Sequence, residues 1–227
     1  MTAHRAKRSS WNARHNRDPY VRAARAGGYR ARAVFKLEQI DRKHRLIRKS
    51  TRVVDLGAAP GSWSQYAAAQ SRVEVVATDL GEMAPIERVR FVRGDFTDDD
   101  VAARVVAALD GRAADLVLSD LAPNISGVRS ADQARAEALH RAVLAFCRRA
   151  LRPGGDLLIK LFEGEAAPAA RKRIEACFER ARSIKPDASR SRSREVYLLA
   201  RGYRPDSGGD GADGLYSNAL NVSASDR

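Results

Sequence analysis

The sequence contains few cysteines and no long apolar segment. Its two cysteines, Cys147 and Cys177, lie in apolar, helix-like patterns that lack the spacing of metal ligands. We therefore expect reduced thiols in a core, no disulfide framework and no metal site. No run of 18 apolar residues occurs, and no signal-peptide apolar segment follows Met1. These absences argue against a membrane span, a membrane partner and secretion, so we expect a cytoplasmic protein.

Acidic residues are scarce in the first fifth of the chain. Residues 1–50 hold 15 of the 41 Lys and Arg residues but only 3 of the 28 Asp and Glu residues, so they carry nearly all of the formal net charge of +13. Residues 1–25 are also polar and aperiodic, which predicts a disordered arm. Such an arm can bind RNA by neutralising successive phosphates and releasing counterions. The alternative is a tail that only solvates the protein; membrane binding is disfavoured because the segment lacks a broad apolar face.

The length of the chain predicts a single folded domain. With 227 residues, 44% of them hydrophobic, it can bury one sizeable core but is too short to favour two full catalytic domains. We place this domain at residues 26–203 and expect a monomer. Residues 204–227 are rich in Gly, Ser and Asp and are expected to form a disordered tail.

Between the ends, short β-branched runs alternate with longer amphipathic stretches. This pattern predicts a Rossmann-like α/β fold: a doubly wound, mostly parallel seven-stranded sheet with helices on both faces. Strands are expected at residues 52–56, 73–79, 89–92, 115–119, 156–161 and 195–200, with a weak strand at 182–185. Helices are expected at residues 31–42, 62–70, 98–109, 131–151 and 165–181.

A glycine-rich turn joins the first predicted strand to a helix, at the place where doubly wound sheets bind nucleotides. Residues 53–63 read Val-Val-Asp-Leu-Gly-Ala-Ala-Pro-Gly-Ser-Trp. The turn lacks the G-x-G-x-x-G pattern of dinucleotide enzymes and the P-loop pattern, which weakens an oxidoreductase interpretation. Asp79 ends the second strand, 22 residues after Gly57, and suits ribose hydroxyls. We therefore predict a site for a nucleoside without a pyrophosphate, as in S-adenosyl-L-methionine.

Asp95 extends this predicted site. It lies in Gly94-Asp95-Phe96 after the third strand, where a carboxylate can meet an adenine amino group. Each element also has a purely structural interpretation: the glycine turn could serve the backbone alone, Trp63 could pack in the core, and Asp79 could cap the following loop.

Two further charged residues stand at the ends of predicted strands. Asp120 follows the fourth strand and is therefore expected at the carboxyl edge of the sheet, where active sites of such folds lie. Lys160 ends a buried apolar run, where a lysine must either reach solvent or meet a carboxylate. Asp120 is the expected partner, and a merely structural salt bridge is the alternative.

These segments resemble the FtsJ/RrmJ/RlmE family of 2′-O-ribose methyltransferases that act on large-subunit (23S) ribosomal RNA. The resemblance runs from about Tyr20 to Gly202 and rests on specific motifs: Phe35-Lys36-Leu37, the loop from Asp55 to Tyr66, Gly94-Asp95-Phe96, Ser119 to Asn124 with Ser126-Gly127, Ile159-Lys160 and the run from Ser189 to Tyr197. It implies S-adenosyl-L-methionine as cofactor and a catalytic tetrad of Lys36, Asp120, Lys160 and Glu195. It further implies that the cofactor is contacted by Gly61, Trp63, Asp79, Asp95 and Asp120.

The same resemblance implies a substrate, a uridine in the A-loop of ribosomal RNA within the large subunit. This chain departs from the family pattern at Ser62, where many relatives carry glycine, and in its tail after Arg204. A ribose 2′-hydroxyl must be aligned with the methyl donor and relieved of its proton, and Lys160 could act as a neutral base or as a charged orienting group. The alternatives are 2′-O-methylation of tRNA or an mRNA cap, and a non-catalytic RNA-binding ribosome-assembly factor.

Overall fold

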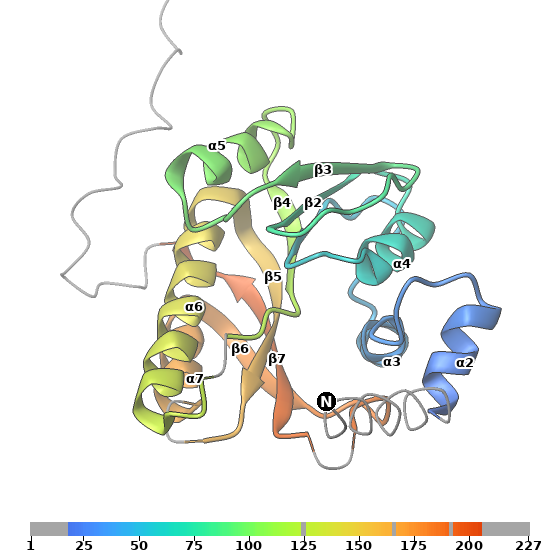
Figure 1. Ribbon diagram of the computed structural model, residues 1–227. Helices are drawn as coiled ribbons and strands as arrows, with labels where there is room; N and C mark the ends of the chain where they lie inside the picture. The colour runs from blue at the N-terminus through green and yellow to red at the C-terminus, as the bar shows by residue number, and fades with distance from the viewer. Residues whose placement is uncertain (1–17, 124–125, 165–166, 191–192, 206–227) are drawn as a thin grey trace, which may run out of the picture.

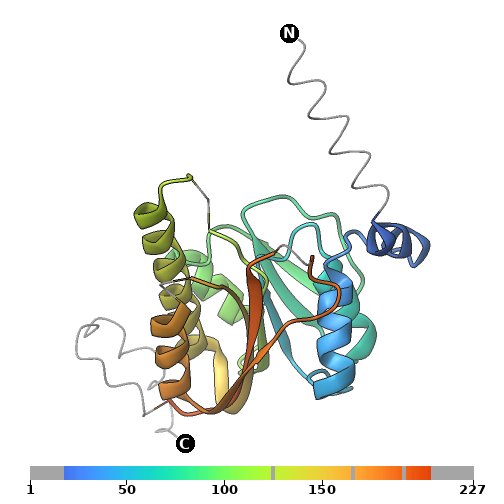
Figure 2. The same ribbon diagram turned by 90° about the horizontal axis from the view of Figure 1, so that it is seen from below.

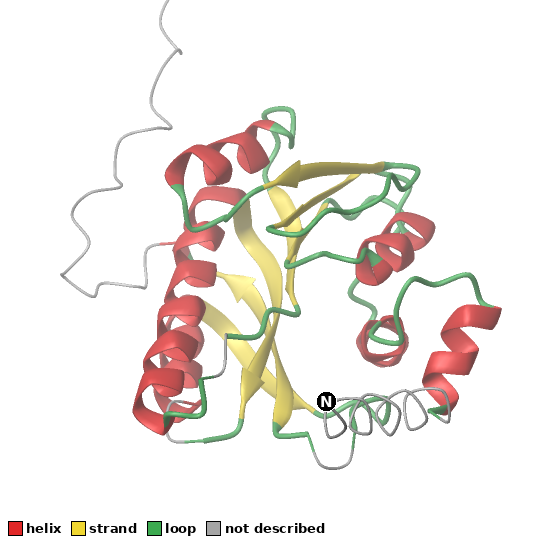
Figure 3. Ribbon diagram, in the orientation of Figure 1, coloured by secondary structure: helices red, strands yellow, loops and turns green. Residues whose placement is uncertain are grey.

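The structure is a computed structural model that describes residues 18–123, 126–164, 167–190 and 193–205. Within these ranges the helices are α2 (Pro19–Ala26), α3 (Val34–His44), α4 (Ser62–Gln70), α5 (Asp99–Ala107), α6 (Arg129–Ala150) and α7 (Ala167–Cys177). The strands are β1 (Val53–Leu56), β2 (Val75–Asp79), β3 (Val89–Arg93), β4 (Ala114–Ser119), β5 (Leu151–Phe162), β6 (Phe178–Ile184) and β7 (Glu195–Tyr203). Figure 3 shows the strands as a central sheet with helices on either side.

The strands form one sheet in the order β3-β2-β1-β4-β5-β7-β6 (Figure 1). Strands β1 to β5 run parallel, whereas β7 pairs antiparallel with both β5 and β6. The strand order reverses between β1 and β4, and the carboxyl ends of parallel strands leave a crevice at such a switch point. The predicted doubly wound, mostly parallel seven-stranded sheet is confirmed.

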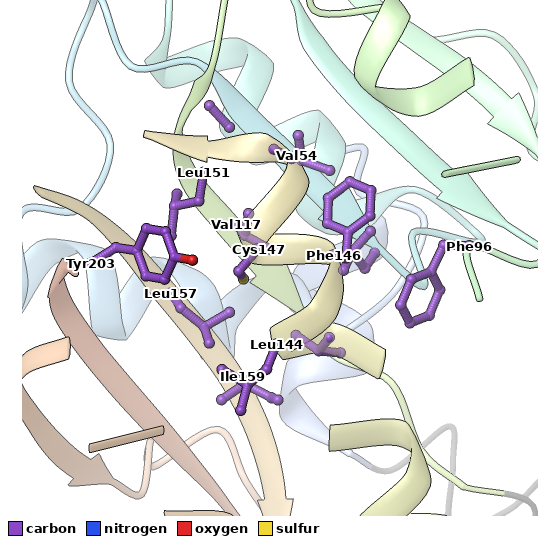
Figure 4. Packing of buried hydrophobic residues seen from close by; sticks show 14 of the residues in the cluster. Val54, Phe96, Val117, Leu144, Phe146, Cys147, Leu151, Leu157, Ile159 and Tyr203 are labelled. Carbon is purple, nitrogen blue, oxygen red and sulfur yellow. The ribbon is translucent and has the colours of Figure 1, made fainter. Parts of the chain in front are cut away.

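Two apolar cores fill the spaces between the sheet and its helices. Helices α5, α6 and α7 cover one face, where Figure 4 shows Phe146 and Cys147 of α6 packed against Val117 of β4 and Leu157 of β5. Helices α3 and α4 cover the other face. Full burial of a side chain such as Leu157 stabilises the folded state by roughly 1.5 to 3 kcal/mol. The predicted burial of Cys147 and Cys177 is confirmed. Over the described ranges, no helix combines the length and the apolar character needed to cross a membrane.

The segment before the last strand differs from the prediction. We expected one helix over residues 165–181, but α7 ends at Cys177 and β6 begins at Phe178. Alanine, arginine and glutamate fill this segment, so local propensity favours a helix. Pairing with β7 overrides that propensity, because Phe178 lies opposite Tyr203 and is only 1% exposed.

The basic arm also differs from the prediction. We expected disorder over residues 1–25, and this is wrong for residues 19–25, because Pro19–Ala26 form α2. The rest of the predicted arm, residues 1–17, lies outside the described residues, as does the predicted tail beyond residue 205.

The start of α2 explains why this part of the arm is helical. The Asp18 carboxylate accepts a hydrogen bond from the Tyr20 amide at 3.0 Å. Pro19 occupies the first turn, where a backbone N–H has no intrahelical acceptor, so the N–H that proline lacks is not missed. Asp18 also forms an ion pair with Arg32, whose guanidinium donates to the Ala188 carbonyl. These contacts tie α2 to the loop that precedes β7.

Candidate active site at the carboxyl edge of the sheet

Lys160 and Asp120 lie side by side at the carboxyl edge of the sheet. Asp120 follows Ser119, the last residue of β4, and Lys160 lies near the end of the neighbouring strand β5. The Lys160 Nζ lies 3.1 Å from Asp120 Oδ1 and donates to the Asp120 carbonyl oxygen at 2.6 Å. Because Lys160 is only 8% exposed, this carboxylate rather than water stabilises its charge. The predicted pairing of the two residues is confirmed.

Lys36 and Glu195 form a second ion pair in the same region. Helix α3 supplies Lys36, β7 begins with Glu195, and Lys36 Nζ lies 2.6 Å from Glu195 Oε1, with both side chains 12% exposed. Burial alone would raise the pKa of Glu195, but that pKa lies below its ordinary value, and the hydrogen bond and charge of Lys36 are the largest of the effects that lower it. The charge of Lys160 acts in the same direction, so the two ion pairs are electrostatically connected.

Tyr197 joins the two ion pairs. Its hydroxyl donates to Asp120 Oδ1 at 2.6 Å, and Lys36 Nζ lies 5.7 Å from the centre of its ring. Tyr197 lies two residues after Glu195 on β7, hence on the same face, and opposite Lys160 of β5. Burial and the Asp120 carboxylate raise the pKa of Tyr197 far above its ordinary value, so the hydroxyl stays protonated and remains a donor. All four predicted tetrad residues therefore gather around a tyrosine that was not among the predicted site residues.

A cavity of about 560 Å³ lies next to this cluster, between the glycine turn and the residues after β4. Its walls are largely apolar and include Phe96, Leu121, Pro123 and Leu139.

Two predicted cofactor residues, Asp79 and Asp95, line this cavity. The oxygens of Asp79 accept the amides of Ala59 and Gly81 at 2.9 and 2.7 Å, so its capping of the following loop, one of the structural alternatives, is also real. One oxygen of Asp95 accepts the Thr97 amide at 2.9 Å. Carboxylate oxygens have more than one acceptor position, so both side chains retain capacity for a ligand.

Gly61 and Trp63 lie at the start of α4, and neither residue lines this cavity. Gly61 has a φ of +109°, a backbone conformation that residues with a Cβ rarely adopt, so glycine is strongly favoured there. The Trp63 ring is 2% exposed and its Nε1 donates to the Ala33 carbonyl at 2.8 Å, which makes the side chain part of the core. The Trp63 amide lies in the first turn of α4, where N–H groups lack an intrahelical partner. The backbone amide, rather than the indole, can therefore contact a ligand.

Asp55 is a second residue absent from the predicted site, although it belongs to the glycine-turn motif. Its side chain is 1% exposed, Oδ2 accepts the Ser64 hydroxyl at 2.6 Å, and Oδ1 has no hydrogen-bond partner among the described residues. The pKa of Asp55 is raised from 3.8 to about 7, chiefly by burial and further by the charges of Asp120 and Asp79. The charges of Asp120 and Asp79 thus act on Asp55, and a positively charged ligand nearby would offset this repulsion.

These features fit an organic cation with a nucleoside part. Apolar walls suit a base, and the two carboxylates that line the cavity suit hydroxyl and amino donors. Asp55 does not line the cavity, but it lies two residues before Gly57, which does, and its unpartnered oxygen favours positive charge nearby when the carboxyl group is ionised. Among the residues that the structure describes, no group of three or more His, Cys, Asp and Glu side chains is placed to hold a metal ion.

Residues 29–203 match the sequence profile of the family described as FtsJ-like methyltransferase. A protein from Pseudomonas aeruginosa named Ribosomal RNA large subunit methyltransferase E is 49% identical over 196 residues, which cover 86% of this chain and 95% of that protein. A protein of the same name from Azoarcus sp. is 50% identical over 192 residues, covering 84% of this chain and 94% of that protein. A crystal structure from Plasmodium falciparum, described as a ribosomal RNA methyltransferase, has 25% identity and a TM-score of 0.68 over 77% of this chain and 98% of that chain. The chain therefore belongs to the FtsJ-like methyltransferase family.

Proposed function

We propose that this protein transfers a methyl group from S-adenosyl-L-methionine to the 2′-hydroxyl of a uridine in the A-loop of 23S ribosomal RNA, within the large ribosomal subunit. The observation that carries the proposal is a largely buried cluster of charged side chains joined by one tyrosine: Lys36, Asp120, Lys160, Glu195 and Tyr197. The relatives named Ribosomal RNA large subunit methyltransferase E, which match this chain over nearly their whole length, support the choice of RNA.

The cavity and the glycine turn support the choice of cofactor. S-adenosyl-L-methionine supplies an electrophilic methyl group on a positively charged sulfur and carries an adenosine without a pyrophosphate. In our proposal Asp79 accepts the ribose hydroxyls and Asp95 accepts the adenine amino group, since both carboxylates line the cavity. Gly61 and the Trp63 amide border the turn, and the buried charge of Asp55 favours a cation.

Lys160 can assist methyl transfer in two ways. The reaction forms an oxygen–carbon bond, breaks the sulfur–carbon bond and releases the hydroxyl proton. A neutral Lys160 would accept that proton, whereas an ammonium would orient the oxygen and stabilise the negative charge that develops on it. The contacts with Asp120, a carboxylate oxygen at 3.1 Å and a carbonyl oxygen at 2.6 Å, stabilise the ammonium. Action as a base therefore requires the substrate to displace these contacts or the amine to lose a proton first.

A methylation assay over several RNA classes tests the reaction and the substrate together. The protein is incubated with labelled S-adenosyl-L-methionine and free 23S ribosomal RNA, isolated large subunits, tRNA or capped mRNA, and the modified nucleotide is mapped. We expect label on one uridine ribose of large subunits, in a linkage that resists alkaline hydrolysis. Label confined to tRNA, to a cap or to a base would contradict the proposal, and so would RNA binding without any transfer.

Variants of Lys160 test the candidate site. Lys160→Ala should abolish turnover while cofactor and RNA still bind, because the proposed role lies in the transition state. Lys160→Arg keeps a positive charge but cannot release a proton at physiological pH. An arginine variant as inactive as the alanine variant identifies a base; substantial turnover identifies a fixed cation. Lys172→Ala, at an exposed lysine of α7, is the matched control. Full turnover by Lys160→Ala would remove Lys160 from the site.

A further inference from the structure

A hollow of about 470 Å³ lies where the carboxyl end of α3 meets strands β6 and β7. Of the seven described residues that line it, none is acidic, and five can carry positive charge: Lys43, His44, Arg180, Arg182 and Arg201. The hollow shares no lining residue with the tetrad or with the cavity beside it.

The register of the sheet explains why these side chains meet. Arg180 and Arg182 alternate along β6 and therefore point to the same face, opposite Arg201 and Leu199 of β7. Leu199 packs in the core under α3, so this is the face that α3 covers. Figure 2 shows α3 beside the orange and red strands β6 and β7. Because β6 is the last strand of the sheet, the basic face continues to its open edge.

Most of the positive charge in the hollow is not neutralised within the described chain. Arg201 lies 3.6 Å from an oxygen of Asp156, but among the described residues Lys43, Arg180 and Arg182 form no ion pair. Burial and the positive charges of Arg182, Arg201 and Lys43 lower the pKa of His44, which indicates a positive potential at this ring. Such a cluster is favourable for an anion that several of these groups can contact at once.

We infer that this hollow binds phosphodiester groups of the RNA substrate, at a distance from the methylated nucleotide. The inference rests on the proposed function and extends it. Lys43 lies seven residues after Lys36 on α3, hence on nearly the same side of the helix and about 10 Å further along it. Along β7, Arg201 lies six residues beyond Glu195, or about 20 Å. An RNA that contacts both places must extend well beyond its target nucleotide, which favours a large structured RNA over a mononucleotide cap.

Salt-dependent RNA binding tests this inference. The double variant Arg180→Ala/Arg182→Ala removes two exposed arginines of the hollow, and Arg104→Ala/Arg148→Ala removes two exposed arginines of α5 and α6 on the opposite layer. Binding of protein-free 23S ribosomal RNA is measured over a series of KCl concentrations. We expect the first variant to lower the slope of log K against log salt by about one to two, since each lost phosphate contact contributes about 0.9. Cofactor affinity, measured by calorimetry, should not change.

Two comparisons sharpen the test. A short stem-loop that carries only the target loop should bind both double variants equally, and with whole subunits the first variant should raise KM more than it lowers kcat. Equal salt slopes for the two variants would overturn the inference. Weaker binding of whole subunits with unchanged binding of protein-free RNA would also overturn it, because a ribosomal protein would then occupy the hollow. A reduced slope of log K against log salt, without methylation of any ribosomal RNA, would support RNA binding by the hollow and contradict only the proposed function.

Discussion

Replacing Asp55 with asparagine is expected to stabilise the folded protein near neutral pH and to weaken its binding of S-adenosyl-L-methionine. The Asp55 carboxylate is 1% exposed, and burial together with Asp120 and Asp79 raises its pKa to about 7. Asparagine has nearly the same shape and can still accept the Ser64 hydroxyl, but it carries no charge. The substitution therefore removes a buried charge without creating a cavity.

The raised pKa of Asp55 sets the sign and the pH window of this effect. Because the folded-state pKa of about 7 exceeds the ordinary value of 3.8, the stabilising contribution of the protonated carboxyl is complete below the ordinary value and is lost as pH rises through about 7. A shift of about three units corresponds to about 4 kcal/mol. The free energy of unfolding of Asp55→Asn, relative to that of the native protein, should increase by up to this amount as pH rises through the window.

Urea unfolding between about pH 5 and about pH 8 measures the effect on stability. The free energies of unfolding of the native protein and of Asp55→Asn should diverge as pH rises, and their difference should become constant above the pKa of Asp55. Ser64→Ala is the matched control, because it removes the hydrogen bond that lowers this pKa, so the free energy of unfolding should keep falling to a higher pH before it levels off. If the difference in free energy of unfolding between the two proteins were the same at every pH measured, the reasoning would be refuted.

Calorimetry measures the effect of the same substitution on binding. S-adenosyl-L-methionine carries a sulfonium charge that S-adenosylhomocysteine lacks. Asp55→Asn should therefore lose more affinity for the former than for the latter, and native protein should show the same loss below the pKa of Asp55. Equal losses for both ligands would show that Asp55 does not act through its charge.

Three further predictions concern other parts of the chain. Asp79→Ala should weaken binding of S-adenosyl-L-methionine by roughly 1.5 to 3 kcal/mol through the loss of two ribose hydrogen bonds, and unchanged affinity in calorimetry would remove Asp79 from the site. Tyr197→Phe removes only the hydroxyl that donates to Asp120, so kcat should fall about tenfold with little change in melting temperature; native kcat would exclude a positioning role. Deleting residues 1–17, which leaves the Asp18 cap in place, should weaken RNA binding and flatten its salt dependence, and identical salt series would reduce the arm to a solvating tail.

The parts of the fold that local pattern determines could be predicted from the sequence. Strands β1, β2 and β4 are buried on both faces, so each appears in the sequence as a short run of β-branched and other apolar residues. The boundary between α7 and β6 could not be predicted in this way, since β6 is a strand only because β7 pairs with it. Helix α2 was missed for a different reason: the Asp18 cap and Pro19 are present in the sequence, but the surrounding arginines suggested a disordered arm.

The residues of the candidate site also differ in whether the sequence alone could identify them. Lys160 could be paired with Asp120 from sequence because both stand at the carboxyl ends of predicted parallel strands, and the structure confirms the contact. Asp55 could not be recognised, since a strand aspartate before a glycine turn reveals neither its burial nor its unpartnered oxygen. Tyr197 had one signal, its position two residues after Glu195, but its hydrogen bond to Asp120 depends on the pairing of β7 with β5.

The antiparallel direction of β7 explains how the tetrad can assemble at one edge. Parallel strands present their last residues at the carboxyl edge, which is where β4 and β5 bring Asp120 and Lys160. Strand β7 begins at this edge instead, so its first residue, Glu195, meets the end of β5 opposite Phe162. The loop before Glu195 is held by Arg32 through the Ala188 carbonyl, and Arg32 in turn pairs with Asp18. The amino-terminal segment thus anchors Ala188 of the connection to β7, while the pairing of β7 with β5 places Glu195 at the edge where it meets Lys36.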